Sequence, residues 1–261
     1  MLGQFINQAF DKCHPFIGSI IAAIIFTSIS LIIIGYVIIR GNEKLRKNEF
    51  RKIAEQINFI SRDKLSKSEV LETVKKCVKL YEDEGGPSGS KSKIHIYNIL
   101  EGSYKGNNLI VFDMKTSSNV TLYSSPSYDT IIWTEIVDSF IPDFDLFDAR
   151  SSIISDAVIK YAVLPFMKLL GYKSPAGEIK VNNVEFSKKY SLYSKDGDGL
   201  RIFSPAVMEY FVKSDFRYNI STRGNKMVIY PYSSHQYPIQ AKDLMSFINK
   251  SNEAIGVLKK A

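Results

Sequence analysis

Three aspartates near the middle of the chain are the residues whose type and spacing best suit chemistry. Residues 142–148 read PDFDLFD, so Asp143, Asp145 and Asp148 largely alternate with apolar side chains. Paired carboxylates can act as general acid and base in a hydrolase, and a D-x-D pair can hold a divalent metal ion. Because side chains two apart in a strand share one face, the stretch also fits a β-strand with its apolar side chains inward and its carboxylates in water. We favour the strand and keep a carboxylate hydrolase as the alternative.

The histidines and cysteines do not form a site in the sequence. His14, His95 and His235 lie far apart, and none has a cysteine or carboxylate at the spacing of zinc ligands. The two cysteines, Cys13 and Cys77, cannot make a framework of disulfide bridges, which suits a reducing compartment. Cys77 falls on the apolar stripe of a predicted helix, so we interpret it as a core residue and not as a nucleophile.

A glycine-rich segment comes close to a phosphate-binding loop. Residues 85–92 read GGPSGSKS, with Ser90 in the place of the second glycine of such a loop. The loop needs a strand before it and a helix after it, so that the N-terminus of the helix faces the phosphates. Here a predicted helix precedes the segment and a predicted strand follows it. We therefore interpret residues 85–93 as a linker, and we predict no cofactor, no metal ion and no catalytic residue.

One long uncharged stretch predicts that the chain is anchored in a membrane. Residues 16–39 run for about two dozen positions without a charged side chain, which is long enough for a helix to cross the hydrocarbon of a bilayer. The apolar core is too long for a cleaved signal peptide, and no small-residue cleavage site follows it. We predict a single transmembrane helix over residues 16–39.

The flanks of this helix predict its orientation. Only Asp11, Lys12 and the terminal amine precede it, whereas six basic residues follow it closely: Arg40, Lys44, Arg46, Lys47, Arg51 and Lys52. Positive charge on the second flank places that side in the cytoplasm. We therefore expect a single-pass protein of the inner (plasma) membrane, with residues 1–15 as a short extracytoplasmic N-terminus and everything after residue 39 in the cytoplasm.

The basic flank also bears on the partners of the chain. The net charge of +7 could indicate nucleic acid, but the densest positive cluster lies beside the predicted membrane helix. Orientation and anionic lipid headgroups account for it there, so we favour lipid over nucleic acid. Phe50, Ile53 and Ile57 give the same segment an apolar face. That face either lies in the membrane interface or packs on the domain or on a second copy, and the sequence leaves both open.

The remainder of the chain predicts an α+β fold. We expect a juxtamembrane helical region over residues 40–84 and a cytoplasmic α+β domain over residues 94–261, with a mainly antiparallel sheet and packed helices. Apolar spacing predicts a helix over residues 42–63 and a second from Ser66. The later elements predicted are strands over 94–100, 109–115, 120–124 and 130–137, a helix over 151–171, a short helix from Ser204, a hairpin over 216–230 and a closing helix that includes Leu244 and Leu258.

Four short motifs resemble a known family. They are GNNLIVFD at residues 106–113, PDF at 142–144, FSKKYSL at 186–192 and LRIFSP at 200–205. Their order resembles that of a family of uncharacterised bacterial membrane-anchored proteins whose cytoplasmic part is a domain of unknown function. The resemblance covers roughly residues 94–258 and departs from the family at 151–181. It implies a fold and a membrane anchor, and it assigns no catalytic residue.

Two classes of function follow from these observations. The first is a membrane-anchored interaction module, a binding or scaffold domain whose protein partner and oligomeric state the sequence does not identify. The second is a hydrolase-like enzyme that uses Asp143, Asp145 and Asp148 on a membrane-derived substrate. No sequence motif for nucleophilic or nucleotide chemistry supports the enzyme, so we favour the module.

Overall fold

The computed structural model describes residues 26–28, 30, 43–62, 64–65, 68–78, 93–117, 127–137, 140–149, 179–194, 197–231 and 239–261. The chain forms two compact units, Met1–Glu49 and Phe50–Ala261. Among the described residues, no helix combines the length and the apolar character that crossing a membrane requires. The predicted membrane helix over residues 16–39 lies outside them, apart from residues 26–28 and 30, which are helical.

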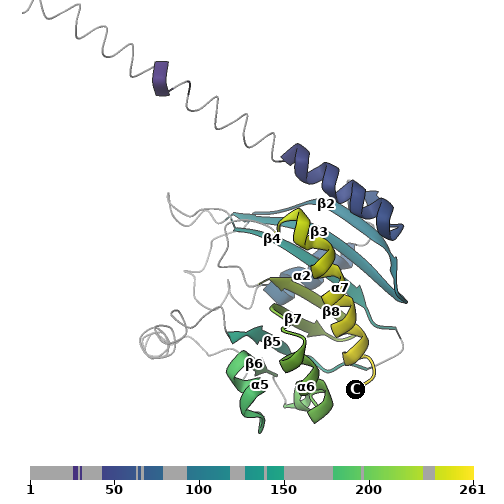
Figure 1. Cartoon of the computed structure of the whole chain (residues 1–261), viewed down its shortest axis with the longest axis vertical. Coiled ribbons are helices and arrows are strands. Elements are labelled where there is room, and N and C mark those ends of the chain that lie inside the picture. The colour runs from purple at the N-terminus through teal and green to yellow at the C-terminus, as the bar shows by residue number, and fades with distance from the viewer. Residues whose placement is uncertain are drawn as a thin grey trace, which may run out of the picture. The chain divides into compact units, whose positions relative to one another are not determined.

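The second unit is an α+β domain, as predicted, built on one antiparallel sheet (Figure 1). Its eight strands lie in the order β1-β2-β3-β4-β8-β7-β5-β6. Their bounds are β1 Ile60–Arg62, β2 Lys93–Tyr104, β3 Asn107–Ser117, β4 Ser127–Glu135, β5 Asp145–Asp148, β6 Tyr190–Tyr193, β7 Tyr218–Arg223 and β8 Lys226–Pro231. The β7–β8 hairpin therefore fills the space between β4 and β5, which are consecutive in the chain but not neighbours in the sheet.

Two tight turns set the register of the longest hairpins. β2 and β3 are joined at Lys105-Gly106, both with positive φ (49° and 83°), and Tyr104 faces Asn107 across the ladder. Such a turn matches the right-handed twist of the flanking strands. Gly224, which begins the turn of the predicted β7–β8 hairpin, also has positive φ, at 63°. Glycine adopts positive φ without the strain that a Cβ introduces.

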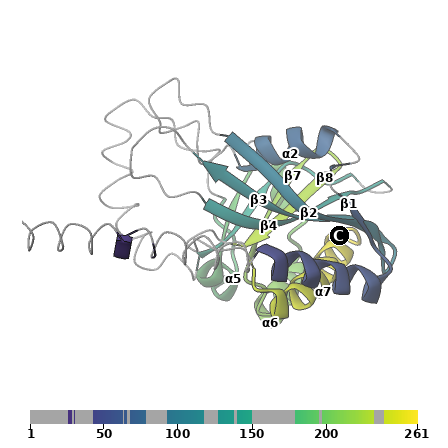
Figure 2. The ribbon, with the colours of Figure 1, turned by 90° about the horizontal axis from the view of Figure 1, so that it is seen from above.

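Helices cover both faces of the sheet (Figure 2). Successive side chains along each strand point to opposite faces. On one face, Leu109 and Val111 pack beneath α5 (Val184–Lys189), α6 (Pro205–Lys213), α7 (Ala241–Leu258) and the helix of residues 43–57 from Phe50 onward. On the other face, Ile110 and Phe112 pack with Val70 and Val74 of α2 (Ser68–Val78). Lys226 of β8 pairs with Glu69 of α2 at 3.1 Å. The period of two in the strands thus supplies two separate apolar cores.

Several local predictions are confirmed. Ser204 caps α6 by accepting a hydrogen bond from the Val207 N–H at 3.4 Å, and Pro205 occupies the first turn. α7 closes the domain and buries the apolar stripe expected of it, namely Leu244, Phe247, Ile248, Ile255 and Leu258. These elements depend on caps and helical spacing, which are local properties of the sequence.

The helix predicted over residues 42–63 ends earlier, at residue 57. Asn58 has φ 58°, and Ile60–Arg62 then pair with β2 as an edge strand. Ile60, expected on the apolar face of the helix, is consequently 58% exposed. Phe59 turns inward over Gly102, where a Cβ would lie 2.4 Å from the Phe59 ring. The close approach of ring and backbone fixes the point at which the helix gives way to the strand.

The apolar face of the helix of residues 43–57 packs on the domain. Phe50, Ile53 and Ile57 are all buried in the core beneath the sheet, with exposed fractions of 1, 6 and 9%. Of the two possibilities that the sequence left open, packing on the domain is the one observed. This face is therefore not available for insertion into a membrane surface.

Other predicted features lie outside the described residues. They include the helix over 151–171, the strand over 120–124, the capping box at Ser66, Cys13, His14 and His235, and the linker over 85–93 except for Lys93, which begins β2. Cys77 falls within α2, and its side chain is also outside the described part. His95 lies in β2, as predicted, where it is exposed and stacks on Tyr97 at 5.7 Å between ring centroids.

Candidate functional site

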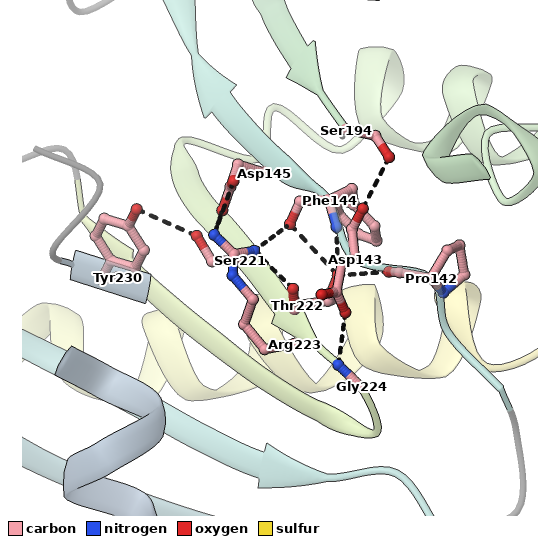
Figure 3. Close-up of polar contacts among 10 residues, drawn as sticks. All are labelled: Pro142, Asp143, Phe144, Asp145, Ser194, Ser221, Thr222, Arg223, Gly224 and Tyr230. Carbon is pink, nitrogen blue, oxygen red and sulfur yellow. Dashed lines mark hydrogen bonds and ion pairs between the residues drawn. The ribbon is translucent and has the colours of Figure 1, made fainter. Parts of the chain in front are cut away.

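The acidic stretch singled out in the sequence lies where β5 meets β7 (Figure 3). Asp143 precedes β5, Asp145 begins it and Asp148 ends it. β5 is an internal strand of the sheet, because β6 pairs with one of its edges and β7 with the other. A four-residue strand in this position is too enclosed to keep all of its polar side chains in water.

Asp145 forms a two-pronged ion pair with Arg223 of β7. The Arg223 Nη2 donates to Oδ1 at 3.1 Å and to Oδ2 at 3.0 Å. The side chains of Arg223 and Asp145 are only 21% and 10% exposed, respectively. The other guanidinium nitrogen, Nη1, donates to the backbone oxygen of Thr222 at 2.7 Å. Hydrogen bonds between ionised groups of this kind are among the strongest in proteins, so the pair joins β5 to β7.

Asp143 is exposed and binds the turn of the β7–β8 hairpin. Its Oδ1 accepts a hydrogen bond from the Gly224 N–H at 2.6 Å. Its carbonyl oxygen accepts from the Ser194 hydroxyl at 2.9 Å, which connects the same segment to the end of β6. Thr222 completes the junction: its Oγ1 donates to the Pro142 carbonyl at 2.7 Å and accepts from the Phe144 N–H at 2.9 Å. These contacts hold the residues that directly precede β5 in one conformation.

Asp148 lies at the opposite end of β5 in a third environment. It is 4% exposed, and its N–H donates to the Asn219 side chain at 3.1 Å. The expectation that the carboxylates face water is therefore wrong for Asp145 and Asp148 and correct for Asp143. The physical reason at Asp145 is that Arg223, 78 residues further along the chain, lies on the neighbouring strand β7 and pairs with it.

These hydrogen bonds and this ion pair stabilise the sheet. Each of the three carboxylates has its own surroundings, and within the described residues no three His, Cys, Asp or Glu side chains come close enough to hold a metal ion. The Arg223 guanidinium is committed to Asp145 and to two backbone carbonyls. Ser221 and Tyr230 place their hydroxyls 3.4 Å apart beside this pair. The chemistry of the cluster is the joining of β5 to the β7–β8 hairpin.

Two further aspartates that the sequence analysis did not single out are buried in the sheet. Asp113 of β3 is fully buried, and its two oxygens accept from Thr130 Oγ1 at 2.8 Å and from Asn98 Nδ2 at 2.9 Å. Asp129 of β4 is 7% exposed, and its Oδ1 has no hydrogen-bond partner among the described residues. Burial raises the pKa of Asp129 from 3.8 to about 6. Asp113 directly follows the apolar residues 109–112 of β3, and Asp129 lies two residues before the apolar residues 131–133 of β4.

The basic residues of the predicted membrane flank are described except for Arg40. Four of them are exposed on the helix of residues 43–57, and Arg46 is half-buried: the exposed ones are Lys44, Lys47, Arg51 and Lys52. Leu45 lies among them and is 61% exposed. The helix therefore presents positive charge to solvent while its apolar face, from Phe50 onward, is in the core.

The fold and this cluster define an α+β protein with an eight-stranded antiparallel sheet whose internal carboxylates brace the strands. No protein-family model matches the chain, and a search of curated proteins finds no significant match. A search of solved structures finds the crystal structure of the mycobacterial trehalose monomycolate transport factor A, TtfA, with a TM-score of 0.41 and 12% sequence identity. The match covers 81% of this chain and 94% of that chain. A similarity at this level assigns neither a family nor a function.

Proposed function

We propose that this chain is a single-pass protein of the inner (plasma) membrane whose cytoplasmic α+β domain binds a partner protein and catalyses no reaction. The observation that carries the proposal is the use of Asp143 and Asp145, the best candidates for chemistry, to join the strands of the sheet. The uncharged residues 16–39 and the basic residues after them support the membrane anchor and its orientation. The family resemblance of the sequence motifs is in keeping with the membrane anchor.

We further propose that the basic flank, Arg40, Lys44, Arg46, Lys47, Arg51 and Lys52, holds anionic lipid headgroups. Each basic side chain near an anionic membrane contributes about 1 kcal/mol, and the attraction decays over about 8 Å at physiological salt. The exposure of Lys44, Lys47, Arg51 and Lys52 supports this use of charge. Because Phe50 and Ile53 are buried, the attraction is electrostatic and involves no apolar insertion by that face.

The anchor is tested by its topology. A reporter that fluoresces only in the cytoplasm is fused after Ala261, and a second reporter that is active only outside the cytoplasm is fused in parallel. We expect signal from the first fusion alone, in the membrane fraction, because the positive flank stays on the cytoplasmic side. Activity of the second reporter would contradict the proposed orientation. Recovery of the chain in the soluble fraction would contradict the proposed anchor.

The lipid contact is tested on a fragment beginning at Glu43, mixed with neutral or anionic vesicles. We expect co-sedimentation with anionic vesicles only, lost at about 0.5 M salt because the interaction is screened. Replacing Lys44, Arg46, Lys47, Arg51 and Lys52 with glutamine is expected to weaken it by about tenfold or more. The control replaces five exposed lysines elsewhere, namely Lys105, Lys180, Lys213, Lys242 and Lys260, and should bind nearly as well as the unmodified fragment. Equal loss of vesicle binding in both variants would mean that the basic flank sets only the orientation of the membrane helix.

A further inference from the structure

A cavity of about 330 Å³ lies at the outer edge of the sheet, beside its last strand, β6. Its walls are β6, the neighbouring helix α5 (Figure 1) and the segment of residues 179–182, which precedes α5 in the chain. The volume falls in the range of pockets that bind small molecules, about 300–1,000 Å³. The cavity is therefore large enough for a small organic ligand.

Two hydrogen bonds hold the segment of residues 179–182 in place. The Ile179 N–H donates to the Leu192 carbonyl at 2.8 Å, which ties the start of the segment to β6. The Ser187 hydroxyl donates to the Val181 carbonyl at 3.2 Å, which ties the segment to α5. Because these contacts form the cavity without a ligand, binding costs little conformational entropy in the protein.

The inner wall of the cavity is apolar. Leu192 and Tyr190 are only 1% and 2% exposed, and Ile179 and Val181 are half-buried and pack against the core. The Tyr190 hydroxyl donates to the Phe211 carbonyl at 3.1 Å, so it is committed to the core. This wall suits a carbon chain and offers no group for acid or base chemistry.

The charge beside the cavity comes from Lys180. Among the described residues that line the cavity, Lys180 is the one charged side chain, and none of them is acidic. Lys180 is exposed and makes no ion pair within the described ranges. The lysines of α5 differ, because Lys188 pairs with Glu185 at 2.8 Å and Lys189 donates to the Val212 carbonyl at 2.8 Å. The cation at this cavity is therefore available to an anionic ligand.

Neutral donors accompany this lysine. The Asn182 amide and the Ser191 hydroxyl line the same cavity. The Leu192 carbonyl points away from β5, because it accepts from Ile179, and in an antiparallel ladder the N–H of a residue points to the same side as its C=O. The Leu192 N–H thus faces the edge of β6 at which the cavity lies. One lysine with neutral donors matches a single negative charge, whereas phosphates are usually held by several cations or by the N-terminus of a longer helix.

We propose that this cavity binds a small organic carboxylate with a short carbon chain. The carboxylate contacts Lys180, and the carbon chain lies against Ile179, Val181 and Leu192. A hydrogen bond between two ionised groups is stronger than one between neutral groups, so the charge of the ligand determines its selection. The site goes beyond the partner binding proposed above and does not depend on it.

The site is tested on the full chain in detergent micelles, with isotope-labelled isoleucine, leucine and valine methyl groups observed by NMR. The probe is hexanoate, and its matched control is hexanamide, which has nearly the same shape without the charge. We expect hexanoate to shift the methyl signals of Ile179, Val181 and Leu192 in a saturable way. The Ile99 signal should stay unchanged, because five strands lie between its strand, β2, and β6. Hexanamide should bind at least about tenfold more weakly, because it lacks the charge that Lys180 recognises.

Three variants separate the charge of the cavity from its shape. Lys180→Gln should weaken hexanoate binding about tenfold, to the level of hexanamide. Lys242→Gln, which removes an exposed lysine of α7, should change it by less than about twofold. Val181→Phe fills the cavity and should abolish the binding of both probes. An unchanged Ile99 signal in each variant confirms that the domain is folded.

Four results would overturn the proposal. Equal affinity for hexanoate and hexanamide would mean that the cavity is apolar and has no anion site. Equal weakening by Lys180→Gln and Lys242→Gln would mean that the acid responds only to the net positive charge of the chain. Tighter binding of inorganic phosphate than of hexanoate, at the same three methyl groups, would assign the cavity to phosphate. The absence of saturable shifts at these methyl groups would remove the site and leave the proposed partner binding as it stands.

Discussion

Replacing Phe50 with alanine is expected to lower the free energy of unfolding of the domain by about 3–5 kcal/mol, the usual cost of removing a buried aromatic side chain. Phe50 is 1% exposed and belongs to the core between the sheet and its covering helices. The side chain comes from the helix that follows the predicted anchor, so the result tests whether that helix is an integral part of the domain. Urea unfolding of a fragment beginning at Glu43 measures the effect without the membrane segment.

Leu45→Ala on the same helix is the matched control. Leu45 is 61% exposed, and its removal should change the free energy of unfolding by less than about 0.5 kcal/mol. A Phe50→Ala effect as small as that of Leu45→Ala would mean that the apolar face is not in the core, and insertion into the membrane interface would become the better explanation. The same argument predicts that a fragment beginning at Ser66, which lacks Phe50, Ile53 and Ile57, is much less stable than one beginning at Glu43.

The parts of the fold that the sequence predicted are those whose signals are local. α7 is identified by apolar residues at helical spacing, from Leu244 to Leu258, and α6 by a serine cap followed by proline. The β7–β8 hairpin is identified by two β-rich runs around Gly224. In each case the residues that define the element also form its contacts, within one or two turns of helix or one reversal of the chain.

The parts that the sequence did not predict depend on partners far along the chain. β1 is a three-residue strand with no periodicity of its own, and it exists because β2 offers an edge at Ile99–Glu101. The insertion of β7 and β8 between β4 and β5 likewise has no local signal. A short edge strand preceded by a residue at positive φ cannot be separated from the end of an amphipathic helix by pattern alone.

The candidate site shows the same limit. The alternation of acidic and apolar residues correctly predicted a strand at residues 145–148, but the expected exposure of the carboxylates was wrong for Asp145 and Asp148. Strand periodicity states which side chains share a face, and it does not state what covers that face. The partner of Asp145 is Arg223, which no spacing rule connects with it. Buried carboxylates such as Asp113 and Asp129 are recognised only once the strands on both sides of them are known.

The Asp129→Asn variant is expected to be more stable than the natural protein at pH 7, which is the reverse of the usual effect of changing a buried residue. Burial raises the pKa of Asp129 from 3.8 in the unfolded chain to about 6 in the folded domain. The folded state therefore holds the proton more tightly, and stability falls as the pH rises from about 4 through 6. A shift of this size corresponds to about 3 kcal/mol at pH 7, which asparagine avoids because it cannot ionise.

The measurement is the difference in free energy of unfolding between Asp129→Asn and the natural sequence, from pH 3.5 to 7.5. It should be near zero at the acid end and should grow through the interval between about 4 and 6, because only the aspartate acquires a buried charge there. Asp113→Asn is the contrasting control. Its carboxylate accepts from both Thr130 and Asn98, so an amide in its place leaves a donor facing a donor and should cost about 1–3 kcal/mol at pH 7. If Asp129→Asn were instead destabilising at pH 7, the ionised Asp129 would have a favourable partner, and that carboxylate would become the leading candidate for a binding residue in the sheet.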